Sequence, residues 1–192
     1  MKQKKHRSGP IALPEKPAIK GSFLKETAKV FAMALVIAIV LKMFIVDSRV
    51  VPSSSMYPTI EEQDRIVLNK LAYVGDRAPQ RGDIVVFKAP EELDSPYDLV
   101  KRVIGLPGEM LEVKDGAVYI DGEALQEGYV FEAPGYAYGP VTVPENCYFM
   151  MGDNRNHSLD SHYWEEPFVP EQEIKGKVVL RYWPFSSFGV LE

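Results

Sequence analysis

The stretch Met110-Leu111-Glu112-Val113-Lys114-Asp115-Gly116-Ala117-Val118-Tyr119-Ile120 decides the fold class of this chain. It consists of two runs in which apolar and polar residues alternate, joined by Asp115-Gly116. An Asp-Gly pair between two alternating runs is a strong signal of a β-hairpin. Alternation with a period of two places successive side chains on opposite faces of a strand. Residues 110–120 are therefore predicted to form two antiparallel strands.

Further short runs rich in β-branched and aromatic residues lie on both sides of this hairpin, separated by turn signals. They comprise residues 65–68, 83–87, 99–104, 141–143, 147–151 and 177–183. Residues 122–140 are rich in Gly, Pro, Tyr and Glu and are expected to form a surface excursion. No long amphipathic helical pattern follows residue 47. Residues 47–192 are therefore predicted to form a mostly β domain, with a small hairpin lobe at about 109–145.

The N-terminal part of the chain has a different composition. Val30 to Leu41 is unbroken apolar sequence, and Met43 to Val46 extends it past Lys42. These 17 residues would form about 26 Å of helix, close to the ~30 Å of a hydrocarbon core. With Phe23 and Leu24 added, residues 23–46 are predicted to form one transmembrane helix, and Lys42 can extend to the headgroups.

Charge is unevenly distributed around this segment. Residues 1–29 carry eight Lys or Arg against two Glu, whereas residues 47–192 carry 13 basic and 25 acidic residues. The positive-inside rule therefore predicts that residues 1–22 are a disordered basic cytoplasmic tail and that residues 47–192 are extracytoplasmic. Such an arrangement suits a bacterial plasma membrane. The adjacent apolar segment also argues against a nucleic-acid partner for the basic tail.

A cleavable signal peptide is the alternative interpretation of the N-terminal part. A basic leader followed by an apolar run fits it. However, no small-x-small cleavage site follows the run, because the next residues are Asp47-Ser48-Arg49. We therefore predict an uncleaved anchor.

Ser55 and Lys101 are the residues whose chemistry is most informative. Ser55 lies nine residues beyond Val46, and a serine hydroxyl needs a base to become a good nucleophile. Lys101 is flanked by Leu99-Val100 and Val103-Ile104, which predicts a largely buried strand. Lysine acts as a base only when neutral, and lowering its pKa from ~10.4 to ~8 by burial costs about 3 kcal/mol. Taken separately, the two residues also fit a plain turn and a structural lysine.

Other side chains leave alternatives open. His157 and His162 could form a Ser-His-Asp arrangement with Ser55, which the spacing does not exclude. Cys147 is the only cysteine, which excludes an intramolecular disulfide, and its neighbours predict a place in the core. No Cys/His/Asp spacing resembles a zinc site, and no Gly-rich loop suggests phosphate binding. We therefore predict neither a metal nor a cofactor.

Four segments in this order, together with the apolar span, resemble the type I signal peptidases, which are membrane-anchored serine–lysine proteases. The resemblance covers the span and nearly all of residues 47–192, and it implies a β domain of the kind shared by signal peptidases and self-cleaving repressors. The segments are Pro52-Ser53-Ser54-Ser55-Met56-x-Pro58-Thr59, Arg81-Gly82-Asp83-Ile84-Val85-Val86-Phe87, Lys101-Arg102-Val103-Ile104-Gly105-Leu106-Pro107-Gly108 and Gly152-Asp153-Asn154-Arg155-Asn156-x-Ser158-x-Asp160-Ser161.

The resemblance implies a role for each matching residue. Ser55 would be the nucleophile and Lys101 the general base. The Ser55 backbone N–H and the Ser53 hydroxyl would stabilise the oxyanion. Ser158 would hydrogen-bond to Lys101. Further support for the site would come from Asp160, Asp153 and Arg155.

The resemblance also implies the substrates and partners. These would be precursors that carry signal peptides, cut after small residues at −1 and −3, and the lipid bilayer itself. The cleaved chain would lie extended beside the strands, partly bound by main-chain hydrogen bonds. Shallow apolar pockets are predicted from Val51, Met56, Ile60, Leu99 and Val100. Five further apolar side chains could lie either in the lipid interface or in the core: Met56, Tyr57, Trp183, Phe185 and Phe188.

Two departures and two rivals accompany this interpretation. Glu109 stands where Asp is common, and His162 stands where relatives often have Arg, so a contact with Asp160 would be pH-sensitive. One rival is a self-cleaving serine–lysine regulator; such regulators are soluble, which the apolar span argues against. The other is a membrane-tethered binding or assembly domain without activity, against which the intact Ser55, Lys101 and Ser158 argue.

Overall fold

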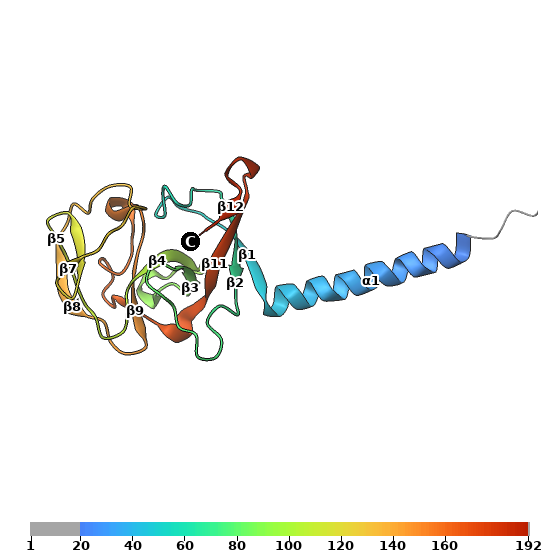
Figure 1. Cartoon of the computed structure of the whole chain (residues 1–192), viewed down its shortest axis with the longest axis horizontal. Helices are drawn as coiled ribbons and strands as arrows, with labels where there is room; N and C mark the ends of the chain where they lie inside the picture. The colour runs from blue at the N-terminus through green and yellow to red at the C-terminus, as the bar shows by residue number, and fades with distance from the viewer. Residues whose placement is uncertain (1–19, 192) are drawn as a thin grey trace, which may run out of the picture. The chain divides into compact units, whose positions relative to one another are not determined.

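The computed structural model describes residues 20–191 (Figure 1). The chain divides into two compact units, Met1–Ile39 and Val40–Glu192. The predicted tail, residues 1–22, lies almost entirely outside the described residues. The rest is one long helix and a β domain, so the predicted class, mostly β with one N-terminal apolar helix, is confirmed.

Helix α1 (Lys20–Phe44) contains the apolar span. Its residues Phe23–Phe44 are long and apolar enough to cross a membrane, although an N-terminal signal sequence would pass the same test. At 1.5 Å per residue this segment is about 33 Å long, which matches a hydrocarbon core. Its large apolar side chains are all exposed, as expected of a helix whose surface is covered by lipid.

The helix ends two residues earlier than predicted. Ile45 still donates its N–H to the Leu41 carbonyl, but Val46 begins strand β1 and is paired with Asn69. Lys70 donates hydrogen bonds to two carbonyls at the end of the helix. Its backbone N–H donates to the Ile45 carbonyl at 2.8 Å, and its Nζ donates to the Met43 carbonyl at 2.7 Å. Strand pairing therefore takes Val46 out of the helix, because both structures compete for the same backbone groups.

The larger sheet of the β domain has eight antiparallel strands. Its order is β1-β2-β11-β3-β4-β9-β10, and β12 pairs with β11. The strands are β1 (Val46–Val50), β2 (Arg65–Asn69), β3 (Ile84–Phe87), β4 (Leu99–Gly105), β9 (Cys147–Met151), β10 (Phe168–Pro170), β11 (Ile174–Trp183) and β12 (Gly189–Val190). The runs predicted at 65–68, 83–87, 99–104, 147–151 and 177–183 lie in strands, except that β3 begins at Ile84 and leaves out Asp83. Strands β1, β10 and β12 were not predicted, because they are short and carry no clear alternation.

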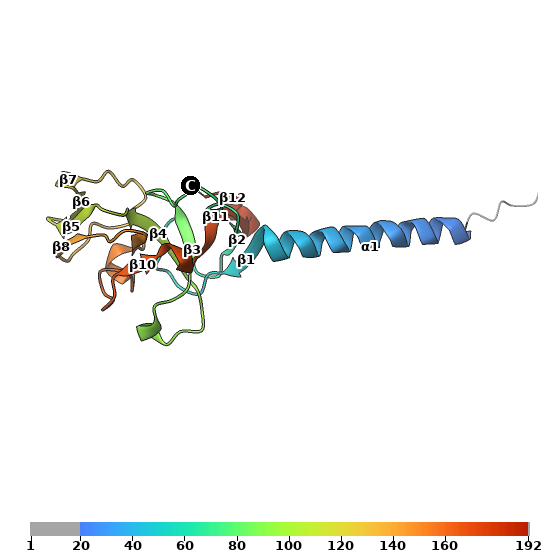
Figure 2. The ribbon, with the colours of Figure 1, turned by 90° about the horizontal axis from the view of Figure 1, so that it is seen from below.

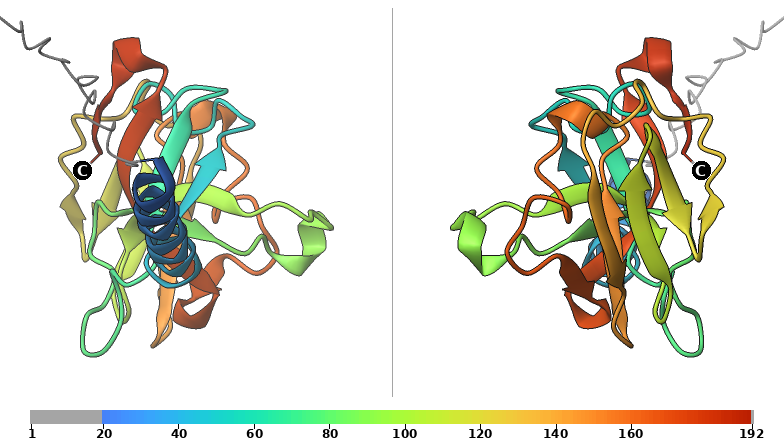
Figure 3. Two further views of the ribbon diagram at one scale, coloured as in Figure 1. Left: turned by 90° about the vertical axis from the view of Figure 1, so that its right-hand side faces the viewer. Right: turned by 90° about the vertical axis from the view of Figure 1, so that its left-hand side faces the viewer.

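The smaller sheet is the lobe predicted at about 109–145. It has the order β7-β6-β5-β8 and consists of β5 (Met110–Lys114), β6 (Ala117–Ile120), β7 (Glu123–Ala124) and β8 (Tyr138–Thr142). The predicted hairpin is β5–β6, and both Asp115 and Gly116 have the positive φ that a tight two-residue turn requires. Figures 1 and 2 show this sheet on the side of β4 away from β1 and β2, and it faces the viewer in the right-hand view of Figure 3.

Strand β4 lies where three apolar clusters meet. Val100 packs against the first core cluster, which includes residues of β2, β3 and β11. Val103 belongs to a second cluster with Val85 and Trp164, and Ile104 belongs to a third that joins the two sheets. Val100 and Val103 thus face different clusters, as strand alternation predicts. Lys101 lies between them and is carried into the interior by its apolar neighbours. Four 3₁₀ turns, η1 (Glu91–Leu93), η2 (Arg155–His157), η3 (Glu171–Glu173) and η4 (Phe185–Ser187), complete the described elements.

Candidate active site

Ser55 lies in a loop that leaves strand β1 and is anchored in the core. The Val51 N–H donates to the Asp64 carbonyl, and the Val51 carbonyl accepts a hydrogen bond from the Gln63 N–H. The loop therefore begins as a continuation of the pairing between β1 and β2. Val51, Met56 and Ile60 are each at most 2 % exposed within the first core cluster. Because these side chains fix the loop on both sides of Ser55, its hydroxyl has a defined position. Ser55 itself is 8 % exposed.

Lys101 meets Ser55 from strand β4. Its Nζ lies 2.5 Å from Ser55 Oγ, within hydrogen-bonding distance, and its side chain is 3 % exposed. Burial lowers the pKa of Lys101 to about 8, against the opposing attraction of Asp160 and Asp153. Desolvation outweighs both carboxylates because they do not contact the amine directly. A substantial fraction of this lysine is therefore neutral near pH 8.

Two donors predicted for an oxyanion lie beside the serine hydroxyl. Ser53 Oγ is 3.4 Å from Ser55 Oγ, and either oxygen could donate. The backbone N–H of Ser55 has no acceptor among the described residues. An unpaired N–H next to a buried hydroxyl is the feature that an oxyanion-binding site requires.

A second loop, residues 152–162, packs directly on the serine loop. We refer to it as the catalytic loop. Asn154 donates its backbone N–H to the Ser55 carbonyl at 3.1 Å and its side-chain Nδ2 to the Ser54 carbonyl at 3.2 Å. Gly152 is wedged in the same place: a Cβ on it would lie 2.3 Å from the Ser55 carbonyl oxygen and 2.4 Å from Ser158 Oγ. Only glycine allows the two loops to approach this closely.

The predicted hydrogen bond between Ser158 and Lys101 is not formed. Ser158 is 6 % exposed, and its hydroxyl has no hydrogen-bond partner among the described residues. Its Oγ instead lies beside Gly152, the residue that is packed against the Ser55 carbonyl. The sequence placed Ser158 in the correct loop, but it could not specify the orientation of a side chain that rotates about one bond.

The acidic residues predicted as support have partners in the structure. Asp160 is fully buried; its Oδ2 accepts the Gly152 N–H at 2.8 Å and its Oδ1 lies 2.6 Å from His162 Nδ1. The contact between Asp160 and His162 is thus present. Asp153 is also fully buried and forms a two-point ion pair with Arg102, at 2.9 and 2.8 Å, while accepting a bond from Thr59.

Several residues of this network were not identified from the sequence. Arg102 was quoted only as part of the segment that contains Lys101, and no role was predicted for it. Arg155 pairs with Glu127, and Tyr136 stacks on His162 at 3.9 Å between ring centroids. Both Glu127 and Tyr136 belong to the predicted surface excursion. Loop residues that act through distant partners leave no periodic signal in a sequence.

The predicted substrate pockets are only partly compatible with the structure. Val51, Met56 and Ile60 are core side chains and line no open surface, because each packs within the first core cluster. Leu99 and Val100 are half-buried at the start of β4 and remain available. Three of the five residues predicted for the pockets are thus buried in this structure, and the pockets themselves stay a prediction.

The two histidines do not form a triad with Ser55. His157 is exposed and has no side-chain partner among residues 20–191, and His162 is hydrogen-bonded to Asp160. Neither side chain is hydrogen-bonded to Ser55, whose hydroxyl contacts Lys101 and Ser53. The described residues also contain no cluster of His, Cys, Asp or Glu suited to a metal ion.

Comparison with known proteins identifies the family. The sequence profile described as "Signal peptidase, peptidase S26" matches residues 24–183, which is most of the chain. The chain belongs to the S26 signal peptidase family. The family predicted from the four segments is therefore confirmed.

Relatives of this family member cover nearly the whole chain. A "Probable signal peptidase I-1" of Synechocystis is 47 % identical over 174 residues, which cover 88 % of this chain and 87 % of the relative. A "Signal peptidase I" of Leptolyngbya laminosa is 40 % identical over 191 residues, covering 95 % and 93 %. The "Thylakoidal processing peptidase 1, chloroplastic" of Arabidopsis thaliana is 36 % identical over 174 residues, covering 86 % and 50 %.

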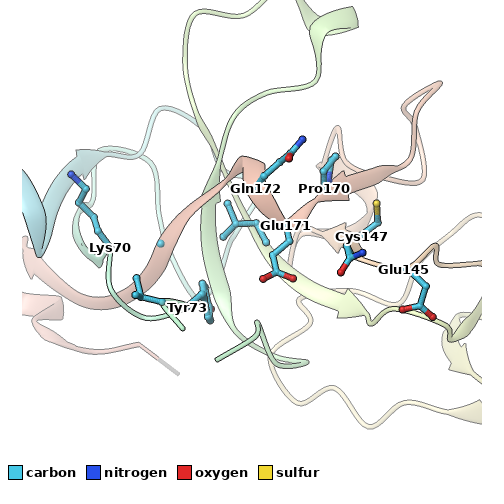
Figure 4. Close-up of a pocket in the computed structure, with 11 residues that line it drawn as sticks. Lys70, Tyr73, Glu145, Cys147, Pro170, Glu171 and Gln172 are labelled. Carbon is cyan, nitrogen blue, oxygen red and sulfur yellow. The ribbon is translucent and has the colours of Figure 1, made fainter. Parts of the chain in front are cut away.

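Cys147 lies away from Ser55, at the opposite end of strand β9 from Gly152. Figure 4 shows it beside a pocket of about 700 Å³ that also contains Glu145 and Glu171. Partial burial raises the pKa of the Cys147 thiol. A thiol that is more strongly protonated than usual is a poor nucleophile. The cysteine is half-buried and packs against the cluster between the sheets, so it lies at the margin of the core and not, as its neighbours had predicted, within it.

Proposed function

We propose that this S26 family member is a membrane-anchored signal peptidase that uses Ser55 as nucleophile and Lys101 as general base. The observation that carries the proposal is the 2.5 Å contact between Lys101 Nζ and Ser55 Oγ. Both residues are buried, so water has little access to either side chain. A base within hydrogen-bonding distance of a serine hydroxyl is the minimum arrangement for acyl transfer.

The first half of the reaction forms an acyl-enzyme. Neutral Lys101 takes the proton of Ser55 as its Oγ attacks the carbonyl carbon of the scissile bond. The resulting oxyanion receives hydrogen bonds from the Ser55 N–H and the Ser53 hydroxyl. Collapse of this intermediate breaks the C–N bond, and the Lys101 ammonium returns the proton to the leaving amine. Lys101 is then neutral again.

The second half hydrolyses the ester. Neutral Lys101 takes a proton from a water molecule as the water oxygen attacks the acyl carbon. The second intermediate expels Ser55 Oγ, which regains a proton from Lys101. Each proton that the lysine accepts is returned, so that the net reaction is hydrolysis of one peptide bond. The lowered pKa of Lys101 suits both halves, because a base is most effective when its pKa lies near the working pH.

The substrates are proposed to be precursors with signal peptides, cut after small residues at −1 and −3. The segment before the cut would lie extended beside residues 48–51 and Leu99-Val100, whose strand edges could donate and accept main-chain hydrogen bonds. The support for these substrates is the family itself, since the relatives of this chain are named as signal peptidases.

Membrane anchoring by α1 is proposed with the N-terminus in the cytoplasm and the β domain on the outer face. The support is the excess of basic residues before the span. The plasma membrane is the proposed location, although the relatives include a thylakoidal enzyme. Protease treatment of sealed right-side-out cell membranes should degrade the β domain, and an intact β domain after that treatment would contradict the orientation.

The reaction is tested by cleavage of a signal-peptide substrate by the full chain in detergent. We expect Ser55→Ala and Lys101→Met to lower kcat by at least ~10⁴-fold, since each removes an essential group. His157→Ala should retain wild-type activity. His162→Asn should keep more than ~1 % of kcat, because loss of a triad histidine would cost far more.

Two outcomes would contradict the proposal. Substantial activity without Lys101 would exclude the serine–lysine mechanism. No cleavage of any precursor by the wild-type chain would favour the membrane-tethered binding domain instead.

A further inference from the structure

The segment between β7 and β8 covers the catalytic loop, although the sequence suggested a simple surface excursion. We call residues 127–136 the strap; they contain no helix or strand. Figure 2 shows the connection from β7 back toward the large sheet. Polar and aromatic side chains at intervals along it contact residues of the catalytic loop and of β4. These contacts make the strap part of the surroundings of the site.

The strongest of these contacts is the ion pair between Glu127 and Arg155. Two charge-assisted hydrogen bonds of 2.7 and 2.6 Å join the carboxylate to the guanidinium. The side chains are 8 % and 0 % exposed, so solvent screens the pair little. Tyr129 donates its hydroxyl to the same carboxylate at 2.7 Å. The Arg155 side chain is therefore held in one orientation.

Arg155 transmits this restraint to Gly152. Its Nε donates to the Gly152 carbonyl at 3.1 Å, while Asp160 accepts the Gly152 N–H at 2.8 Å. Both polar groups of Gly152 are thereby fixed. Because the Gly152 Cα is wedged between the Ser55 carbonyl and Ser158, any displacement of this residue must alter the packing around the nucleophile.

Other strap residues hold the same region. Phe131 donates its N–H to the Asp153 carbonyl at 3.3 Å, and its ring packs edge-on against Tyr57 at 4.8 Å. Tyr129 lies 3.9 Å beneath the Arg102 guanidinium, which pairs with Asp153. Tyr136 stacks on His162, the partner of Asp160. The strap thus contacts both carboxylate pairs that support the site.

We propose that Glu127 is a positioning residue for the serine–lysine reaction: through Arg155 it fixes Gly152 and hence the distance between the catalytic loop and Ser55. The inference rests on the proposed function. Glu127 does not touch the reacting atoms, so it should influence turnover more than substrate binding. The strap then couples the small sheet to the reaction carried out at the edge of the large one.

The test compares Glu127→Gln with Glu123→Gln in the full chain in detergent. Glu123 is an exposed glutamate of β7 with no side-chain partner in the described structure, so it is a matched control. We expect Glu127→Gln to lower kcat about 10- to 100-fold with KM within about threefold of wild type. The control should match wild type in both constants.

The pH profile separates positioning from a general loss of structure. Loosening of Gly152 admits water to the site and relieves the desolvation of Lys101. The acidic limb of kcat/KM should therefore move to higher pH in Glu127→Gln and remain in place in Glu123→Gln. Glu127→Asp, which keeps the charge, should recover part of the lost kcat.

Tyr129→Phe provides a second variant if Glu127→Gln does not fold. It removes one hydrogen bond to Glu127 and keeps the ring, and it should lower kcat about two- to fivefold. A wild-type kcat in Glu127→Gln would overturn the inference. If only Tyr129→Phe folds, a wild-type kcat in that variant would do the same. A loss of kcat in Glu123→Gln as large as in Glu127→Gln would also overturn it. None of these results affects the proposed function, which depends on Ser55→Ala and Lys101→Met.

Discussion

The pKa of Lys101 fixes the pH dependence of the proposed reaction. Burial lowers this pKa to about 8, so the amine is charged and inactive as a base below that pH and neutral above it. The value of kcat/KM should therefore rise with pH, with a midpoint near 8, and level off above it. The measurement is initial-rate cleavage of a signal-peptide substrate from pH 6 to 10. A rate that is flat over this range, or that falls through pH 8, would contradict the assignment of Lys101.

Gly152 tests the contact between the two loops at the level of a single atom. In Gly152→Ala the new Cβ would lie 2.3 Å from the Ser55 carbonyl oxygen, which belongs to the backbone and cannot turn aside. We expect kcat/KM to fall at least ~100-fold as the loops separate. The control is Gly189→Ala in β12, because a Cβ at that position would meet no atom within 4 Å. Equal activities of the two variants would show that the loops tolerate separation.

At the scale of elements, the ion pair of Arg102 and Asp153 ties β4 to the catalytic loop. Both side chains are buried, at 3 % and 0 % exposure. Asp153→Asn removes the carboxylate that balances a buried guanidinium and should lower the free energy of unfolding by about 3–5 kcal/mol. Urea unfolding of the full chain in detergent would measure it.

The matched control for that pair is Glu91→Gln. Glu91 and Lys88 form an exposed ion pair, which should contribute less than ~1 kcal/mol. A loss in Asp153→Asn no larger than in this control would mean that β4 and the catalytic loop are held together by packing alone.

Elements also show which structural features a sequence pattern can predict. Strands β2, β3, β4, β5, β6, β9 and β11 follow from alternation and turn residues, because both act over neighbouring positions. The strap does not follow from such a pattern. Its Gly, Pro and Tyr content predicted an exposed loop, whereas Glu127 is nearly buried by its pairing with a residue 28 positions away.

At the scale of the whole molecule, the β domain has an exposed apolar cluster. It consists of Trp183, Phe185, Phe188 and Val190, from β11, η4 and β12, which are 44–75 % exposed. Of the residues predicted for either the lipid interface or the core, Met56 belongs to the core, whereas Trp183, Phe185 and Phe188 do not. Exposed aromatic residues in a membrane-anchored domain are suited to the lipid headgroup region.

Tryptophan fluorescence can test contact of this cluster with lipid. The full chain has two tryptophans, of which Trp164 is buried and Trp183 is exposed. In vesicles that contain brominated lipid, Trp164→Phe should show strong quenching of the remaining Trp183, and Trp183→Phe should show little. Equal quenching in the two variants would place the cluster away from the bilayer.

The sequence by itself determined the apolar helix, most of the strands and the family, and it singled out Ser55 and Lys101 as the candidate catalytic pair. All of these follow from local patterns: the length of an apolar run, alternation along a strand, and short motifs. Only the tertiary structure decided the 2.5 Å contact between the two residues, the burial that lowers the lysine pKa, and the pairing of Arg155 with Glu127. These features arise where the two sheets and their loops pack together, and such contacts between distant residues depend on the whole fold rather than on neighbouring positions.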